Sequence, residues 1–452
     1  MAGAPHELSL AEAADAIRDG KLSPIDLVED CLRRIELVEP IVSAFVTVMA
    51  EAARAEAKRA ADAEPHGPLH GVPVAVKDLI DTAGVATEGG CAAFAGRIPT
   101  ADATVVSRLK TAGAIVVGKT HTHEVAYGLS TPQSRNPWDT SRMTGGSSGG
   151  SAAALAAREV PGALGSDTDG SVRNPAAYCG VTGLKTTFGV VPKDRTIVLS
   201  WSYDTIGPMA RSARDCAILL QVIVGRTAED PASVDAALES VVDFAGLRVG
   251  IAENWFSDGV DADVLELVEA GVRELAGVGQ GMRPVRLPNI GQHAGAGTAV
   301  VFAEASQYHR TRMREAPHLF TEETRSYLEA GTLVPAVDYI AAQQARRLLR
   351  AEFEEAFETV DVIATPVTPC VAPPHGATDI DGVPLIPATT PFTFPVNGVG
   401  LPAIALPCGF NRAGLPVGMQ LVGPAFSDLR LTTIGDAFQQ RTDWHLRAPE
   451  VV

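Results

Sequence analysis

The stretch TGGSSGGS (residues 144–151) runs without interruption into AAALAA (152–157). A flexible Gly/Ser linker is normally flanked by polar residues, whereas AAALAA is suited to a tightly buried helix. Glycines at this density beside a buried helix indicate close backbone approach or unusual backbone angles. We therefore predict a constrained loop that holds Ser147, where a serine hydroxyl can face a reacting group.

A second polar stretch, GSDTDGS (165–171), ends 24 positions after Ser147. It follows a short apolar run and precedes a segment restrained by proline. Successive backbone amides at Thr168, Asp169, Gly170 and Ser171 are expected to point inward as an anion-binding nest, the geometry that an oxyanion hole requires. Taken alone, the same turn is also compatible with a purely structural role.

A serine nucleophile needs a base, and no histidine lies in a context typical of a buried proton relay. Lys77 directly follows the apolar run GVPVAV (71–76), in a chain with 7 lysines among its 37 basic residues. Arginine cannot act as a base, so a lysine beside a buried strand favours that role. Burial would have to lower its pKa by about 3 units, at a cost of roughly 4 kcal/mol. A buried Lys77 paired with Asp78 or another carboxylate is the alternative.

Composition and charge limit the class of protein. With 46% hydrophobic and 20% charged residues among 452, the chain can bury a large core. The net charge of −17, without clustered Lys and Arg, argues against a nucleic-acid partner. Six cysteines without CxxC spacing suit neither a zinc site nor a disulfide framework. We expect reduced thiols and, because the N-terminal residues lack a secretory signal pattern, a cytoplasmic protein.

Apolar periodicity predicts an α/β architecture. After two N-terminal helices, GVPVAV (71–76) and AIVVG (114–118) have the length and composition of buried strands, with a helix between them. This alternation favours a mostly parallel sheet. TVDVIATPV (359–367) and GLPAIALPCGF (400–410) are expected to complete the sheet as further buried strands.

Two later regions differ in composition. Residues 230–350 are rich in Glu, Asp and Arg with helical periodicity, which predicts a variable outer helical layer or cap within a single domain spanning 1–452. Residues 382–411 carry no charge, but their six prolines exclude a membrane helix, so we expect buried loops and strands there and no membrane association.

Two other motifs resemble ligand sites. Residues 113–120, GAIVVGKT, match the Walker A pattern letter by letter. In a phosphate loop, however, the strand precedes the first glycine, whereas here the β-branched run lies between the glycines, so we expect no nucleotide site. His121 and His123 have no third ligand in view and are expected to be ordinary loop histidines, with no metal bound.

Three motifs together resemble the amidase signature family. They are Lys77 in GVPVAVKD, Ser147 in GGSSGGSAAALAA, and Ser171 in GSDTDGSVRNPAAYCGVTGLK. The motifs are long, and their order and spacing match over residues 8–225, with a further match over 360–445. The resemblance implies an α/β fold with a mixed, mostly parallel sheet covered by helices on both faces.

The resemblance also implies roles for the matching residues. Ser171 would be the nucleophile, Ser147 a bridging serine preceded by a cis peptide bond, and Lys77 the base. Asp167 and Arg173 resemble residues that brace the nucleophile turn, a surface ion pair being the alternative.

Three positions depart from the family pattern. The family commonly has Gly in place of Asp169, Thr in place of Ser166, and Pro in place of Thr186. Because a carboxylate inside an oxyanion hole would oppose catalysis, we expect the Asp169 side chain to turn outward, leaving only its N–H in the hole.

These features together predict an amidohydrolase that cleaves a carboxamide C–N bond through an acyl-enzyme, without metal or organic cofactor, acting on a small-molecule amide. The alternatives are the glutaminase subunit of an amidotransferase and, more remotely, a non-catalytic binding protein on the same fold. A homodimer is expected from the resemblance alone. Nothing in the sequence identifies the acyl group.

Overall fold

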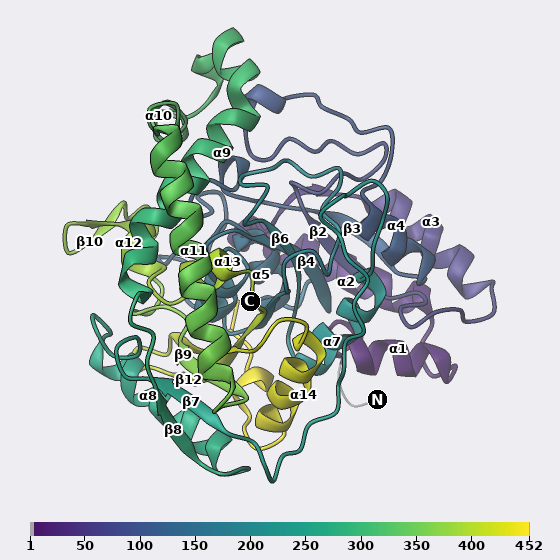
Figure 1. Ribbon diagram of the computed structural model, residues 1–452. Coiled ribbons are helices and arrows are strands. Elements are labelled where there is room, and N and C mark those ends of the chain that lie inside the picture. The colour runs from purple at the N-terminus through teal and green to yellow at the C-terminus, as the bar shows by residue number, and fades with distance from the viewer. Residues whose placement is uncertain (1–3, 452) are drawn as a thin grey trace.

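The computed structural model describes residues 4–451 (Figure 1), and within them an 11-stranded sheet passes through the molecule. From one edge to the other its strands are β1 (Phe45–Val48), β3 (Ile115–Thr120), β2 (Pro73–Lys77), β4 (Gly162–Asp167), β6 (Thr205–Ala210), β5 (Thr182–Lys185), β12 (Ala403–Phe410), β13 (Pro416–Val422), β9 (Val362–Pro366), β7 (Val249–Ala252) and β8 (Met282–Val285). A separate small hairpin pairs β10 (Asp379–Ile380) with β11 (Val383–Pro384).

Helices cover both faces of the sheet, as predicted. Along β2, Val74 and Val76 join one hydrophobic cluster while Ala75 joins the other, because successive side chains on a strand point to opposite faces. The first cluster packs under α1 (Leu10–Arg18), α4 (Thr104–Thr111), α7 (Ala213–Ile223), α8 (Ala262–Ala276) and α14 (Asp428–Gln439); the second packs under α2 (Pro24–Val42), α3 (Ala50–Ala61), α5 (Gly149–Ala156) and α6 (Arg173–Cys179).

The predicted predominance of parallel strands is wrong, although the sheet is mixed as expected. Among the ten pairings within the described sheet, four are parallel and six are antiparallel. Five of the six antiparallel pairs occupy the centre, where a short turn joins β12 to β13, and the sixth joins β1 to β3 at one edge. Strands buried on both faces give continuous apolar runs whatever their direction, so the sequence pattern could not distinguish the two.

The region 230–350 is not the purely helical layer that the sequence predicted. Its first part contributes β7, α8 and β8, which extend one edge of the sheet. Strand β7 is mostly buried, whereas β8 forms the edge and is partly exposed. Its second part forms α9 (His293–Glu315), α10 (Glu322–Gly331) and α11 (Ala336–Phe357), which stand together at one side of the molecule (Figure 1). The interpretation of residues 1–452 as one domain remains a prediction.

The uncharged segment 382–411 contains two helices, where its prolines predicted only loops and strands. These are α12 (Leu385–Thr389) and α13 (Phe394–Val399), followed by β12 as expected. Both are short, and α13 places Pro395 in its first turn, where the missing N–H costs no hydrogen bond. Within residues 4–451, no helix is both long enough and apolar enough to cross a membrane.

The remaining helical turns are of the 3-10 type and are short: η1 (Pro5–Glu7), η2 (Ala92–Phe94), η3 (Glu124–Ala126), η4 (Ile290–Gln292), η5 (Pro317–Leu319) and η6 (Trp444–Leu446). The Walker-like residues 113–120 form strand β3 and not a phosphate loop. Lys119, on this strand, lies 3.1 Å from Asp78 and donates to the hydroxyl of Thr87 at 2.7 Å. All six cysteines are free thiols.

Candidate active site

Lys77 is the last residue of β2, on the sheet face that α5 and α6 cover. Its side chain is 0% exposed, and Nζ lies 2.7 Å from Ser147 Oγ and 2.9 Å from Ser166 Oγ. Burial lowers the pKa of Lys77 to about 7, although nearby carboxylates act in the opposite direction. Asp78, the alternative partner, lies against Lys119 instead. Lys77 is therefore a buried amine, directed at two hydroxyl groups, that can lose its proton near neutral pH.

Ser147 lies in the glycine-rich loop before α5. The peptide bond between Gly146 and Ser147 is cis, as the family resemblance predicted. A side chain at position 146 would collide with the carbonyl group of Ser130, so only glycine fits there. The Ser147 carbonyl accepts a hydrogen bond from the His123 N–H at 3.2 Å. The glycines of TGGSSGGS thus serve close packing, as predicted, and place a buried hydroxyl against Lys77.

A buried ion pair holds the turn that carries Ser171. Arg173 donates to both carboxylate oxygens of Asp167, at 3.0 and 2.9 Å, and both side chains are 0% exposed. The same carboxylate accepts the backbone N–H groups of Gly170 at 2.9 Å and Val172 at 3.1 Å. Burial alone would raise the pKa of Asp167, but the adjacent Arg173 guanidinium outweighs it and holds that pKa well below its usual range. The alternative of a surface ion pair is wrong.

The Asp169 side chain points toward the nucleophile, so the prediction that it turns outward is wrong. The Ser171 hydroxyl donates to Asp169 Oδ1 at 3.3 Å. Burial, and then the charge of Asp167, raise the pKa of Asp169 to about 7. The carboxyl group is therefore partly uncharged near neutral pH, which weakens the repulsion on which the prediction rested.

The two serine segments are in contact through their backbones. The N–H of Ser148 donates to the carbonyl of Ser171 at 3.1 Å. In the part of the chain that the structure describes, no hydrogen bond joins the hydroxyls of Ser147 and Ser171 directly, because Ser171 Oγ is turned to Asp169. A rotation of the Ser171 side chain would have to precede any transfer of its proton to Ser147.

The expected set of oxyanion donors loses one member. Because the Gly170 N–H donates to Asp167, it is not free to bind a substrate oxygen, and the prediction for this amide is wrong. Gly170 has φ +134°, and a Cβ there would collide with the Thr393 hydroxyl, so the turn requires glycine. The N–H groups of Thr168, Asp169 and Ser171 are the remaining candidates.

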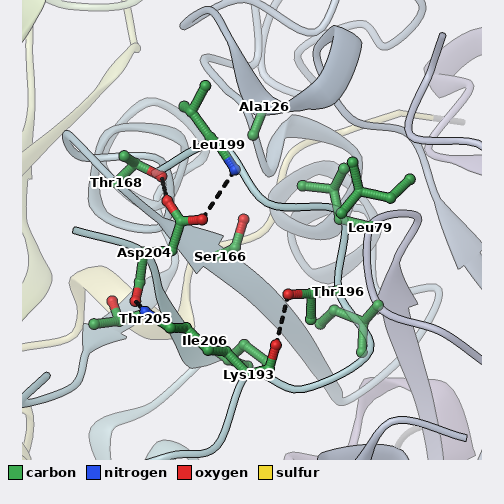
Figure 2. Close-up of a pocket in the computed structure, with 12 residues that line it drawn as sticks. Leu79, Ala126, Ser166, Thr168, Lys193, Thr196, Leu199, Asp204, Thr205 and Ile206 are labelled. Carbon is green, nitrogen blue, oxygen red and sulfur yellow. Dashed lines mark hydrogen bonds between the residues drawn. The ribbon is translucent and has the colours of Figure 1, made fainter. Parts of the chain in front are cut away.

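A small cavity with both polar and apolar lining residues lies beside this turn, and Ser166 and Lys193 are among them (Figure 2). The carboxylate of Asp204 accepts the Thr168 hydroxyl at 2.7 Å and the Leu199 N–H at 3.0 Å. The loop 199–204 thereby holds the first residue of the candidate oxyanion turn in place.

Sequence reasoning missed three contributors to the site. Ser166 binds Lys77, Asp204 holds Thr168, and Thr393 donates from its hydroxyl to the Asp169 carbonyl at 2.6 Å. Of the three contacts, only the one between Ser166 and Lys77 has a feature in the sequence that could have predicted it, namely that both residues lie near the ends of apolar runs. Ser166 lies near the end of β4, which pairs in parallel with β2, so the two strand ends meet at one edge of the sheet. That pairing was not evident from the sequence.

Comparisons with known proteins agree with this geometry. The family model described as Amidase matches residues 26–432. The chain is 41% identical to a glutamyl-tRNA(Gln) amidotransferase subunit from Roseiflexus sp. (strain RS-1), covering 99% of each chain. It is also 41% identical to an amidase of Pseudomonas putida, covering 98% of each.

The fold is similar to a solved structure of an s-triazine catabolic enzyme, from a vestigial protein complex with inhibitor bound. The TM-score is 0.90 at 32% identity, covering 96% of this chain and 98% of that one. The chain therefore belongs to the amidase signature family, and it is an enzyme that acts on carbon–nitrogen bonds.

Replacing Arg173 with methionine should destabilise the protein by about 3–5 kcal/mol, because it leaves the Asp167 carboxylate buried without its partner. Urea unfolding followed by circular dichroism measures the change. The matched control is Arg350→Met, which breaks the exposed pair with Glu354 and should cost roughly 0.5 kcal/mol or less. Equal effects of the two substitutions would contradict the bracing role of Arg173.

Proposed function

We propose that this amidase hydrolyses a carboxamide through an acyl-enzyme on Ser171, with Ser147 relaying protons to Lys77. The observation that carries the proposal is the buried Lys77 amine at 2.7 Å from the hydroxyl of a serine that follows a cis peptide bond. An amine with a pKa of about 7 is partly uncharged at neutral pH and can accept a proton.

The reaction begins when Ser171 Oγ attacks the amide carbon. Its proton passes to Ser147 Oγ as the Ser147 proton passes to Lys77 Nζ, which becomes an ammonium ion. Backbone N–H groups among Thr168, Asp169 and Ser171 stabilise the oxyanion, each contributing about 3–4 kcal/mol. The same chain of groups then runs in reverse and protonates the leaving nitrogen as the C–N bond breaks.

Water completes the cycle by attacking the ester on Ser171. The proton of the attacking water passes through Ser147 to Lys77. The tetrahedral intermediate then collapses to the carboxylic acid, and the proton returns from Lys77 through Ser147 to Ser171, which regenerates the free enzyme. Asp167 and Arg173 take no part in proton transfer in this proposal, since both are buried and bonded to each other; they fix the turn.

A second candidate function is that of a glutaminase working within an amidotransferase. The 41% identity to the glutamyl-tRNA(Gln) amidotransferase relative, over nearly the full length of both chains, favours it. Glutamine hydrolysis that begins only when a second protein is added would support this candidate, whereas hydrolysis of amides by the purified chain alone supports the first.

Three expectations remain predictions: that the protein is cytoplasmic, that it forms a homodimer, and that residues 230–350 are a variable specificity region.

A serine-directed fluorophosphonate should label Ser171 stoichiometrically, because the proposal makes this hydroxyl the nucleophile. Peptide mass spectrometry locates the adduct, and Ser171→Ala should abolish it. Folded protein that acquires no adduct would favour the remote alternative, a binding protein on this fold.

Activity should rise with pH through about 7, because protonated Lys77 cannot accept a proton and the amine becomes a base as it titrates. Lys77→Ala should lower kcat/KM roughly 10²- to 10⁴-fold and remove this acid limb. The control is Lys119→Met, which replaces an equally buried lysine that touches neither serine. If the acid limb persists in Lys77→Ala, Lys77 is not the base.

Asp169→Asn should move the acid limb of the kcat/KM profile to lower pH. The negative charge of Asp169 favours the protonated form of Lys77, so removing that charge lets Lys77 lose its proton more readily and lowers its pKa. Profiles of wild type, Asp169→Asn and Asp169→Glu measure the effect. A limb that stays in place or moves upward in Asp169→Asn would show that Asp169 is not charged in the free enzyme.

A further inference from the structure

An apolar cleft of about 460 Å³ lies between the helical layer and the uncharged segment. One wall comes from η4, α9 and α10, including Phe302 and Tyr327, and the other from 384–395, including Phe394 and four prolines. Trp255 also lines the cleft, with its indole N–H held by the Pro391 carbonyl at 2.8 Å. None of the fifteen described residues that line this cleft carries a charged side chain.

The segment that forms one wall of the cleft is hydrogen-bonded to the candidate oxyanion turn. Thr390 and Phe394 line the cleft, and Thr393, between them in the chain, donates its hydroxyl hydrogen bond to the carbonyl of Asp169. The same segment that forms the apolar wall is therefore bonded to the residue that touches the nucleophile.

Tyr127 forms a second connection between the cleft and the turn. Its ring centroid lies 5.7 Å from that of Phe302 and 5.0 Å from that of Tyr327, both of which line the cleft. Burial raises the pKa of Tyr127 well above its usual value, and the charges of Tyr327 and Asp169 add to this effect. The side chain is 3% exposed, and its hydroxyl has no hydrogen-bond partner among the described residues. A buried hydroxyl without a partner is costly unless a ligand group satisfies it.

The chemistry of the cleft selects a class of ligand. Aromatic rings and prolines favour a flat or branched apolar group, while a carboxylate or ammonium group would lose its hydration without gaining an opposite charge. Glutamine, a free amino acid whose side chain ends in an amide, carries both of these charges on its α-carbon. The cleft therefore suits a neutral aryl or branched alkyl group, and the Tyr127 ring packs behind the aromatic side chains that line it.

We propose that this cleft binds the apolar group of the substrate, so that the preferred substrates are amides with a neutral aryl or branched alkyl substituent and not free amino acid amides. This inference rests on the proposed function, because it takes Ser171 as the reacting atom.

The test compares two fluorophosphonates, one with an ethyl group and one with a phenylpropyl group. Intact-protein mass spectrometry gives the rate constant of Ser171 labelling for each. We expect the phenylpropyl probe to react at least tenfold faster with wild type. Ala294→Trp, an exposed position of α9 that lines the cleft, fills the space and should lower this ratio at least tenfold.

The matched control is Gly295→Trp, the next residue of the same helix, where an added side chain meets nothing within 4 Å. It should leave the ratio of labelling rates unchanged. A ratio that stays constant in Ala294→Trp, or that falls equally in Gly295→Trp, would overturn the assignment of the cleft while the function of Ser171 stands.

A binding measurement separates the cleft from the chemistry. Calorimetry with Ser171→Ala should detect 3-phenylpropanamide and the anilide of acetic acid more strongly than glutamine, and the stronger of the two shows on which side of the amide bond the cleft lies. Ala294→Trp in that background should weaken binding at least tenfold. Failure of all labelling at Ser171 with cleft binding intact would reject the proposed function alone, and preferred binding of glutamine would reject the cleft proposal alone.

Discussion

The removal of the Lys77 amine from water is the constraint on which the site depends. Three lysines in the described chain are 0% exposed, and they have different partners. Lys119 lies beside the Asp78 carboxylate, and Lys185 donates to the carbonyls of Thr186 and Leu401. Lys77 instead faces the hydroxyls of Ser147 and Ser166.

Burial lowers the pKa of Lys185 to about 7 as well, so what distinguishes Lys77 as the candidate base is its contact with two serine hydroxyls. A carboxylate at contact distance favours the charged ammonium ion, whereas a hydroxyl offers no compensating charge. Burial therefore lowers the pKa of Lys77 to about 7, while Asp167, Asp204 and Asp169 at greater distance limit the shift. Desolvation therefore dominates the pKa of Lys77, the candidate base, whereas the Asp167 carboxylate supports the turn that carries Ser171.

The nucleophile turn combines a rigid element with a titratable one. Asp167 and Arg173 are fully buried and bonded to each other, so the backbone from Gly170 to Val172 is fixed from below. Asp169 lies on the same turn but has a pKa raised to about 7 and touches the Ser171 hydroxyl. One carboxylate thus gives a permanent charge to the structure, and its neighbour gives a charge that varies near neutral pH.

Helices α9 and α10 contact the part of the sheet that carries the candidate catalytic residues through the segment 123–127. Glu124 accepts the Thr321 N–H at the start of α10, and Tyr127 packs its ring against those of α9 and α10. Since Ser147 accepts the N–H of His123, the same segment is bonded to the cis peptide loop. The residues that shape the apolar cleft are therefore connected to the catalytic groups by direct contacts and not only by proximity in the fold.

The sequence by itself determined the class of the fold, and it singled out Lys77, Ser147 and Ser171 as candidate catalytic residues, because local motifs carry glycine density, strand ends and serine spacing. It also indicated the buried strands, since long apolar runs are recognisable without knowing their neighbours. Strand direction in the centre of the sheet was not recognised, because strands buried on both faces show the same continuous apolar run in either direction. The short helices within 382–411 and the strands β7 and β8 within 230–350 were not recognised either, because such short segments hold too few residues to establish a periodicity.

Only the tertiary structure decided which polar groups meet. The roles of Ser166, Asp204 and Thr393 depend on distances between segments far apart in the chain. The inward Asp169 carboxyl and the loss of the Gly170 amide to Asp167 are local contacts that depend on the conformation of the folded turn. With a charged Asp169 carboxylate assumed, the sequence predicted that its side chain turns outward. That prediction was wrong because the pKa of Asp169 depends on burial and on the charge of Asp167, and both are properties of the folded turn.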